Sequence, residues 1–344
     1  MEGVAWSDSD FQRGDSVVNR RTFIVSAAGS VLAVPYASRA QKSAMPVIGF
    51  LNGGSPAGSV YLAAAFRQGL RETGYVEGQN VAMEVRWTEG DSDRPPRLVA
   101  ELVQRPVALI AVGGGSAVRR AAKAATATIP IVFVTGGDPI TEGLVANLGR
   151  PAGNITGVTV PTTTLNTKRL ELLNQLVPPR ETIAVLANPA GSWTEDQARD
   201  MQSVARTMGR KIHVVNASSE REIEAAFASL ATLRASALLV SADPLFNSRL
   251  RQLVDLTQRH RVPAIFEWRE FATAGGLMSY GSDIANGYRE AGVYAGRILN
   301  GTKPSELPVL QATKFEFVVN LTTAKALGLA IPQPLLIRAD EVIQ

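Results

Sequence analysis

Apolar and polar positions alternate in two periods along the chain from about residue 45 onward. Short apolar runs such as Pro46–Asn52, Val107–Val112 and Ile129–Thr135 each end in a turn rich in glycine and serine. Segments with helical spacing follow such runs, as at Ser59–Thr73, where apolar residues recur on one face. The chain is therefore predicted to alternate strands and helices, which is typical of parallel sheets covered on both faces.

The same rhythm continues to the end of the chain. Further strands are expected at Asn80–Thr88, Ile155–Val160, Thr182–Asn188, Lys211–Asn216, Ala237–Ala242, Pro263–Glu267, Gly276–Tyr280 and Lys314–Val319. Further helices are expected at about Arg94–Gln104, Ala117–Ala127, Thr164–Leu176, Thr194–Met208, Glu220–Leu233, Pro244–His260, Ile284–Asn300 and Thr322–Leu327.

About a dozen strands are too many for one sheet in a chain of 344 residues. We therefore expect an α/β protein with two doubly wound parallel-sheet lobes joined by a three-stranded hinge. The N-terminal lobe would comprise residues 46–160 plus about 284–305, and the C-terminal lobe residues 161–283 plus about 309–344. The chain would cross between the lobes near Val158–Thr164, Gly281–Ile284 and Gly301–Pro308.

Residues 1–40 have the pattern of an export signal. Arg20 and Arg21 precede an apolar run from Phe23 to Tyr36, and small residues surround Arg39 at the expected cleavage site. The paired arginines are of the twin-arginine type. The alternative, a membrane anchor, needs a longer apolar run and a stop-transfer pattern. The mature protein is therefore expected to be exported, soluble and periplasmic.

The amino-acid composition argues against several kinds of binding and catalytic site. The sequence has no cysteine and only two histidines, His213 and His260, which argues against thiolate or histidine sites for metals and catalysis. The net charge of +4 is spread among acidic residues rather than clustered, so nucleic acid is not an expected partner. We expect a monomer with no cofactor and no stable insertion into a membrane.

The loops at the carboxyl ends of the strands are the expected ligand site, because open α/β sheets bind ligands there. Gly113–Ser116 would bring backbone amides and a helix N-terminus to an anion, although an ordinary tight turn explains the glycines equally well. No lysine follows as in a P-loop. The loop residues expected to bind the ligand are Asn52, Gly54, Ser55, Gly115, Ser116 and Asn188.

Acidic and aromatic residues at other strand ends complete the predicted site. Asp138, Asp243 and Asp283 could each hold a ligand ammonium, and each could instead be a helix N-cap. Trp268, Tyr280 and Phe246 could form an aromatic wall against an apolar part of the ligand, with core packing as the alternative for Phe246.

Several stretches of the chain resemble one known family. They are MPVIGFLNGGSP at 45–56, FRQGLRETGYVEGQNVAMEVRW at 66–87, IPIVFVTGGDPITEGLVANLGRPAGNITGVT at 129–159, KRLELLNQLVP at 168–178, SADPLFNSR at 241–249, IFEWREFATAGGLMSYG at 265–281 and TKFEFVVNLTTAKALGLAIPQPLLIRADEVI at 313–343. Together they resemble the ABC-transporter substrate-binding family typified by tryptophan- and tyrosine-binding proteins, which has the type I periplasmic binding fold.

This resemblance implies a periplasmic receptor that captures a small polar ligand, of which an amino acid is one candidate. The receptor would present the ligand to the permease of an ABC importer without catalysis. Two features depart from the family pattern. There is no cysteine after the signal to carry a lipid anchor, which implies a free periplasmic protein. The loop after the third strand is GGGS where a Gly-Thr-Pro sequence is expected, so Ser116 would replace a threonine hydroxyl.

Two other functions are compatible with the layout. An exported α/β hydrolase would need a Gly-x-Ser-x-Gly elbow with a histidine partner, and the nearest run, Gly113–Ala117, is Gly-Gly-Gly-Ser-Ala instead. A bilobal protein that senses an effector in signalling would need a DNA-binding helix-turn-helix or a membrane span, and the export signal stands where the former is expected.

Overall fold

The structure is a computed structural model that describes residues 45–344 apart from 92, 163–164, 179–180 and 191–194. The predicted export signal lies outside the described residues. Residues Met45–Gln344 form one compact unit. It contains two sheets, as the alternating pattern predicted.

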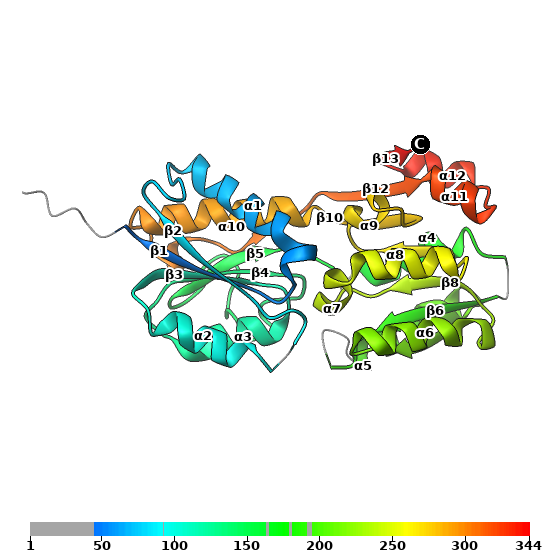
Figure 1. Cartoon of the computed structure of the whole chain (residues 1–344), viewed down its shortest axis with the longest axis horizontal. Helices are drawn as coiled ribbons and strands as arrows, with labels where there is room; N and C mark the ends of the chain where they lie inside the picture. Colours follow the sequence, from blue (N-terminus) through cyan, green and yellow to red (C-terminus); the bar gives the residue numbers. More distant parts are fainter. Residues whose placement is uncertain (1–44, 92, 163–164, 179–180, 191–194) are drawn as a thin grey trace, which may run out of the picture. The chain divides into compact units, whose positions relative to one another are not determined.

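The first sheet has the strand order β11-β5-β4-β3-β1-β2, and every pair in it is parallel. Its strands are β1 (Val47–Asn52), β2 (Ala82–Trp87), β3 (Val107–Gly113), β4 (Ile131–Thr135), β5 (Ile155–Thr159) and β11 (Leu310–Gln311). Its helices are α1 (Pro56–Glu72), α2 (Pro95–Val103), α3 (Ser116–Ala125) and α10 (Ile284–Leu299). Figure 1 shows α1 and α10 on one face of this sheet and α2 and α3 on the other.

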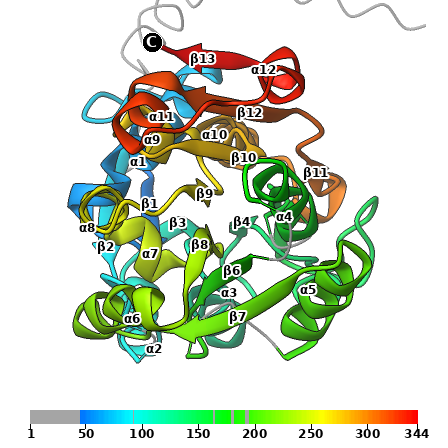
Figure 2. The same cartoon turned by 90° about the vertical axis from the view of Figure 1, so that its right-hand side faces the viewer.

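The second sheet has the order β13-β12-β10-β9-β8-β6-β7. Its strands are β6 (Thr182–Ala187), β7 (Lys211–Asn216), β8 (Ala235–Val240), β9 (Ala264–Phe266), β10 (Met278–Ser282), β12 (Phe315–Asn320) and β13 (Glu341–Ile343). The helices around it are α4 (Asn166–Asn174), α5 (Glu195–Thr207), α6 (Glu220–Thr232), α7 (Pro244–Ser248), α8 (Leu250–Arg259), α9 (Arg269–Thr273), α11 (Leu321–Leu327) and α12 (Gln333–Arg338). Helices α4 and α5 lie on the opposite face from α6 and α8 (Figure 2).

The two sheets share one topology. Strands β2-β1-β3-β4-β5 and β7-β6-β8-β9-β10 follow the same order, in which the chain reverses its direction of winding beside the first strand of each lobe. That switch point is where open α/β sheets leave a crevice for ligands. Each lobe therefore carries one binding edge, next to β1 and β3 in the first sheet and next to β6 and β8 in the second.

The chain passes between the sheets three times. It leaves the first sheet after β5, returns after β10 to form α10, and leaves again between β11 and β12. The last passage follows Gln311, whereas the sequence placed it at Gly301–Pro308. The reason is that Leu310 and Gln311 still pair with Val158 and Thr159 of β5.

Three details differ from the predicted elements. The expected single helix Pro244–His260 is broken at Arg249, whose φ of −110° and ψ of 24° end α7 and begin α8. The second sheet is not wholly parallel, because β12 runs antiparallel to β10. The short elements α9, α12, β11 and β13 were not predicted, since runs of two to six residues carry little periodicity.

The hydrophobic cores lie between the sheets and their helices. The core under α2 and α3 and the core under α4 and α5 are separate clusters. The third cluster extends from α1 and α10 of the first lobe to α6, α8 and α9 of the second, and it includes Phe66, Tyr288 and Trp268. Apolar packing is therefore continuous between the lobes beside the binding edges.

Candidate functional site

A cavity of about 590 Å³ lies at the carboxyl ends of both sheets. Residues from both lobes line it, so neither lobe forms the site alone. The predicted ligand residues that line this cavity are Asn52, Gly54, Gly115, Ser116, Asp138, Asp243 and Trp268. A cavity of this size accommodates a molecule as large as an amino acid with an aromatic side chain.

The other predicted residues, Ser55, Asn188, Phe246, Tyr280 and Asp283, are not among those that line the cavity. Ser55 and Asp283 are helix N-caps that accept hydrogen bonds from the backbone N–H groups of Gly58 and Asn286. N-capping was the alternative that the sequence left open for Asp283, and this hydrogen bond gives its carboxylate a structural partner.

The two aromatic residues in this group pack elsewhere. Phe246 is completely buried in the core, which is the alternative considered for it from the sequence. Tyr280 packs against Phe315 and Phe317 and lines a different cavity of about 450 Å³. Consecutive strand residues point to opposite faces, and the Tyr280 ring lies against β12 rather than at the binding edge.

One asparagine stands at each switch point and makes the same local turn. The Oδ1 of Asn52 accepts a hydrogen bond from Gly54 N at 2.8 Å, and the Oδ1 of Asn188 accepts one from Ala190 N at 3.0 Å. In each case the amide donates across the crevice, from Asn52 to the Tyr288 hydroxyl at 2.5 Å and from Asn188 to Asp243 Oδ1 at 2.9 Å. Both side chains are buried, so they fix the loops on which the cavity depends.

The loop after β3 presents the start of α3 to the cavity. Gly114 and Gly115 have φ angles of 71° and 115°, a region that side chains other than glycine rarely adopt. A Cβ on Gly114 would also lie 2.5 Å from the nitrogen of Gly53 in the loop after β1. No side chain caps α3, which leaves its first amides and the Ser116 hydroxyl in the cavity wall. This arrangement suits an anionic group.

Asp243 is engaged by the protein itself. Besides the bond from Asn188, its Oδ1 accepts the backbone N–H of Leu245 at 2.9 Å and caps α7. Its side chain is 3% exposed. The predicted alternative of an N-cap is therefore observed, while the residue also lines the cavity.

Arg119 and Glu142 line the first-lobe side, and the sequence analysis did not nominate them. The Arg119 guanidinium donates two hydrogen bonds to the Glu142 carboxylate, at 2.8 and 2.9 Å, and the Thr135 hydroxyl donates a third at 2.8 Å. The two charged side chains are 6% and 18% exposed. Because Arg119 is paired with Glu142, the two side chains together add little net charge to the cavity wall.

Three aromatic side chains, Tyr61, Trp268 and Tyr288, contribute to the cavity wall. Burial raises the pKa of Tyr288 and of Tyr61, so both phenols are neutral at physiological pH. Of the three, the sequence analysis nominated only Trp268. Tyr61 and Tyr288 occupy apolar-face positions of α1 and α10, where core packing is the usual expectation from a sequence.

Glu267 follows β9 and lines the second-lobe side of the cavity with 3% of its surface exposed. Burial raises its pKa to about 8, although the Arg169 guanidinium and the side chains of Asn247 and Trp268 lower it. Neither carboxylate oxygen meets hydrogen-bond geometry. The sequence did not indicate Glu267 as a ligand residue, because it is the last residue of the predicted strand rather than part of the loop beyond it.

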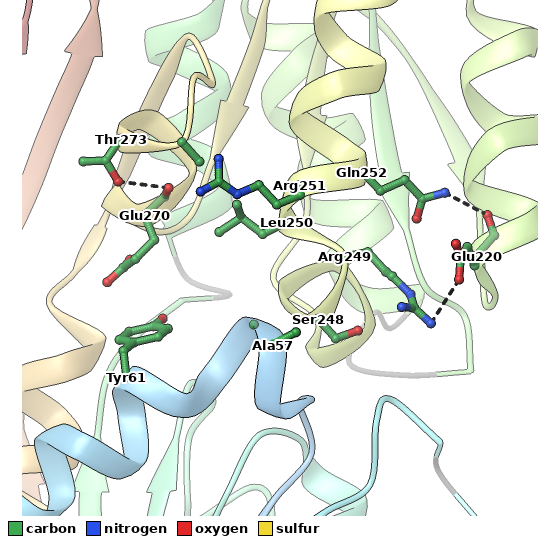
Figure 3. A pocket seen from close by; sticks show the side chains of 12 residues that line it. Ala57, Tyr61, Glu220, Ser248, Arg249, Leu250, Arg251, Gln252, Glu270 and Thr273 are labelled. Carbon is green, nitrogen blue, oxygen red and sulfur yellow. Dashed lines mark hydrogen bonds and ion pairs between the residues drawn. The ribbon is translucent and has the colours of Figure 1, made fainter.

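A second cavity, of about 460 Å³, lies between the start of α1 and helices α8 and α9. Figure 3 shows Tyr61 and Glu270 pointing toward each other there, with the Arg249–Glu220 ion pair on the far side. Burial raises the pKa of Glu270. Tyr61 lines both cavities and so forms part of the wall between them.

Neither His213 nor His260 lines the cavity of about 590 Å³. No group of three or more His, Cys, Asp or Glu side chains in the described part of the chain could hold a metal ion. His213 is exposed on β7, and His260 is the exposed C-cap of α8. Within the same residues, no helix has the length and apolar character needed to cross a bilayer.

Comparisons with known proteins agree with this architecture. The chain is 27% identical over 265 residues to the tyrosine-binding protein of Clostridioides difficile (strain R20291), covering 77% of this chain and 75% of that protein. A solved structure from Streptococcus pneumonia, an ABC domain in complex with L-Trp, is 25% identical with a TM-score of 0.77 and covers 87% of this chain and 99% of its own.

A conserved domain protein from Vibrio cholerae has the same fold. It is 22% identical with a TM-score of 0.78, and the match covers 87% of this chain and 99% of that one. The model of the family described as ABC transporter substrate binding protein matches residues 56–343, which is most of the chain. Strand β1 and the cavity residues Asn52 and Gly54 precede that match, whereas the other strands and the other residues that line the cavity fall within it. The chain belongs to the ABC transporter substrate-binding protein family.

Proposed function

We propose that this protein is an exported receptor that captures one amino acid in the cavity between its lobes and delivers it to the permease of an ABC importer. The observation that carries this proposal is the cavity itself, about 590 Å³ in volume, at the binding edges of both sheets. A ligand held by both lobes stabilises the arrangement in which the lobes face each other, and this difference between ligand-bound and free forms is what a permease can recognise.

The cavity wall matches the groups of an amino acid. The amides at the start of α3 and the hydroxyl of Ser116 suit a carboxylate. Tyr61, Trp268 and Tyr288 supply aromatic surface for a side chain. A relative named as a tyrosine-binding protein and a structural neighbour in complex with L-Trp favour an aromatic amino acid.

Export and lobe boundaries are parts of the same proposal. The arginine pair Arg20–Arg21 and the apolar run after it support a periplasmic location. The N-terminal lobe would comprise residues 46–160 and about 284–305, extended to β11 by its pairing with β5. The C-terminal lobe would comprise 161–283 and the residues from β12 onward. We propose a monomer that carries out no catalysis.

Titration calorimetry of the purified protein with the twenty common amino acids tests this function. We expect one or a few aromatic amino acids to bind with one site and a micromolar or lower Kd, which corresponds to about −8 kcal/mol. Ligand recovered after incubation should be chemically unchanged, as required of a receptor. Conversion of the ligand would instead favour an exported enzyme.

The Ser116→Ala variant tests the assignment of the carboxylate subsite. It should weaken binding by about 10- to 100-fold, which corresponds to the loss of one hydrogen bond to a charged group. Ser55→Ala is a matched control, because Ser55 caps α1 and does not line the cavity. Equal effects of the two changes would contradict the assignment of Ser116.

A further inference from the structure

Glu267 is a buried acid whose polar neighbours, the side chains of Asn247 and Trp268, favour its ionised form without reaching the geometry of an ordinary hydrogen bond. It is 3% exposed, lines the cavity, and has neither carboxylate oxygen in hydrogen-bond geometry. Asp243, on the same wall, accepts bonds from Asn188 and from the backbone of Leu245. A buried carboxylate without such bonds is costly, so the position of Glu267 is explained better by binding than by folding.

Arg169 of α4 is the basic group behind Glu267. Its side chain is completely buried, and two of its nitrogens donate to Tyr280 O at 2.7 Å and to Asn166 Oδ1 at 2.8 Å. The third, Nη2, has no hydrogen-bond partner. Arg169 is absent from the cavity wall, so it acts on the ligand only through Glu267 and is a positioning residue.

Gly281 keeps this arrangement compact. A Cβ on Gly281 would lie 1.9 Å from the carbonyl oxygen of Glu267 and 3.7 Å from Nη2 of Arg169. The absence of a side chain at this position lets β10 approach the residue that follows β9. The Glu267 backbone is thereby fixed while its carboxylate remains at the cavity.

Other ionisable groups near Glu267 come from two more elements. Asp243, at the start of α7, raises the pKa of Glu267, and Tyr61 of α1 interacts with it electrostatically. With both acids ionised, the two carboxylates outweigh the single charge of Arg169. This wall then has a net negative charge, because no basic residue balances it on the cavity side. The second-lobe residues that line the cavity are Thr162, Gln197, Ala242, Asp243, Pro244, Asn247, Glu267 and Trp268.

We propose that Glu267 is the subsite for a cationic group of the ligand, an ammonium that donates hydrogen bonds to its carboxylate. This inference rests on the proposed function, because it takes the ligand to be a small molecule bound in this cavity. The ammonium would lie across the cavity from the anion-binding start of α3. An α-amino acid carries both charges on one carbon, and its side chain would then extend along the aromatic wall.

Proton release should accompany this binding. Since burial raises the pKa of Glu267 to about 8, the carboxyl is largely protonated at pH 6 to 7 in the free protein. An ammonium requires the ionised form, so the carboxyl loses its proton to solvent when the ligand binds. Affinity should therefore increase as the pH rises from 6 to 8, by at most about tenfold per pH unit for one proton.

Two pairs of probes isolate the ammonium. L-tryptophan is compared with indole-3-propionate, and L-tyrosine with 3-(4-hydroxyphenyl)propionate, which lack only the amino group. We expect Glu267→Gln to lower the affinity for the amino acid by tenfold or more and to change the affinity for the deaminated acid by less than twofold. The variant should also lose the pH dependence of affinity between pH 6 and 8. Glu270→Gln is the matched control, because Glu270 is a nearby acid with a raised pKa that lines the other cavity (Figure 3).

The wild-type protein supplies a measurement that needs no variant. Calorimetry in buffers of different ionisation enthalpy should detect the release of a fraction of a proton to one proton per ligand at pH 7. Wild-type binding with no such release, or affinity that falls as the pH rises, would overturn the inference. Unchanged binding by a folded Glu267→Gln variant would also overturn it and leave the proposed function intact.

A different set of results would reject the proposed function itself. A wild-type protein that binds neither the amino acids nor their deaminated analogues would reject the proposed ligand class, and the cation subsite with it. Binding of the deaminated acids as tightly as the amino acids would keep an aromatic ligand site and reject only the role of Glu267.

Discussion

Asn52 and Asn188 show how single residues position the site. Each closes the same turn after the first strand of its lobe, and each donates across the switch point to a partner distant in sequence. Asparagine suits this position because one amide both accepts from the backbone and donates to a side chain. The sequence predicted both residues as ligand contacts, and only Asn52 lines the cavity, while Asn188 supports Asp243 from behind.

At the residue scale, the Arg119–Glu142 pair should contribute measurably to stability. We expect Glu142→Ala to lower the free energy of unfolding by about 2 to 4 kcal/mol, because it leaves a nearly buried guanidinium without its partner. Urea denaturation measures this change. Glu101→Ala is the control, since its pair with Arg97 is exposed and such pairs contribute about 0 to 1 kcal/mol. A loss at Glu142 as small as at Glu101 would contradict a structural role for the buried pair.

The raised pKa of Glu267 makes a prediction about stability as well as binding. The folded protein holds the proton of this carboxyl up to about pH 8, whereas the unfolded chain releases it near its ordinary value. The folded state therefore binds more protons between those values, and the contribution of this group to stability falls as the pH rises from about 5 to 8. Melting temperatures of wild type and Glu267→Gln should consequently diverge over this range, with the variant declining less. Parallel curves would show that Glu267 titrates normally.

At the scale of elements, α1 and α10 meet at unusually close range. A Cβ on Gly69 would lie 1.8 Å from the carbonyl oxygen of Arg289, and a Cβ on Gly292 would lie 2.1 Å from that of Phe66. The two helices carry Tyr61 and Tyr288 into the cavity wall. Their close packing thus sets the position of two aromatic groups that would contact the ligand.

The Gly292→Ala variant tests that packing. Glycine to alanine within a helix ordinarily stabilises a protein by about 0.5 to 1 kcal/mol. Here we expect the opposite sign, a loss of about 1 to 3 kcal/mol, because the added methyl meets backbone atoms. Gly149→Ala is the control, because a Cβ on this loop residue would meet only Asn147 Oδ1, at 3.4 Å. It should change the free energy of unfolding by less than about 0.5 kcal/mol. Stabilisation by Gly292→Ala would show that the helices are farther apart.

The elements were easier to predict than the site. Apolar strands ending in glycine-rich turns predicted both sheets, because buried parallel strands leave a continuous apolar run in the sequence. The break at Arg249 and the antiparallel β12 escaped prediction, since neither alters the local apolar pattern. At the site, loop residues such as Ser116 were predictable from strand ends. Tyr61, Arg119 and Tyr288 were not, because helix residues that face a cavity have the same spacing as residues that face a core.

At the scale of the whole chain, the two lobes repeat one topology and bring two switch points to one cavity. The first lobe contributes an uncapped helix start, at which we propose an anionic group binds, and the second contributes buried acids. Opposite charge preferences on the two lobes are suited to a ligand that carries both charges, and such a ligand gains its full affinity only when both lobes contact it. This account explains binding without requiring a nucleophile, a metal or a cofactor.

The most direct test of this account is titration calorimetry of the protein with L-tryptophan and L-tyrosine between pH 6 and 8. We predict one-site binding of at least one of them, with affinity that increases with pH in the wild type and not in Glu267→Gln. Absence of binding by both amino acids, at protein concentrations that would reveal a Kd of 100 μM, would contradict the central claim that the cavity is an amino-acid site.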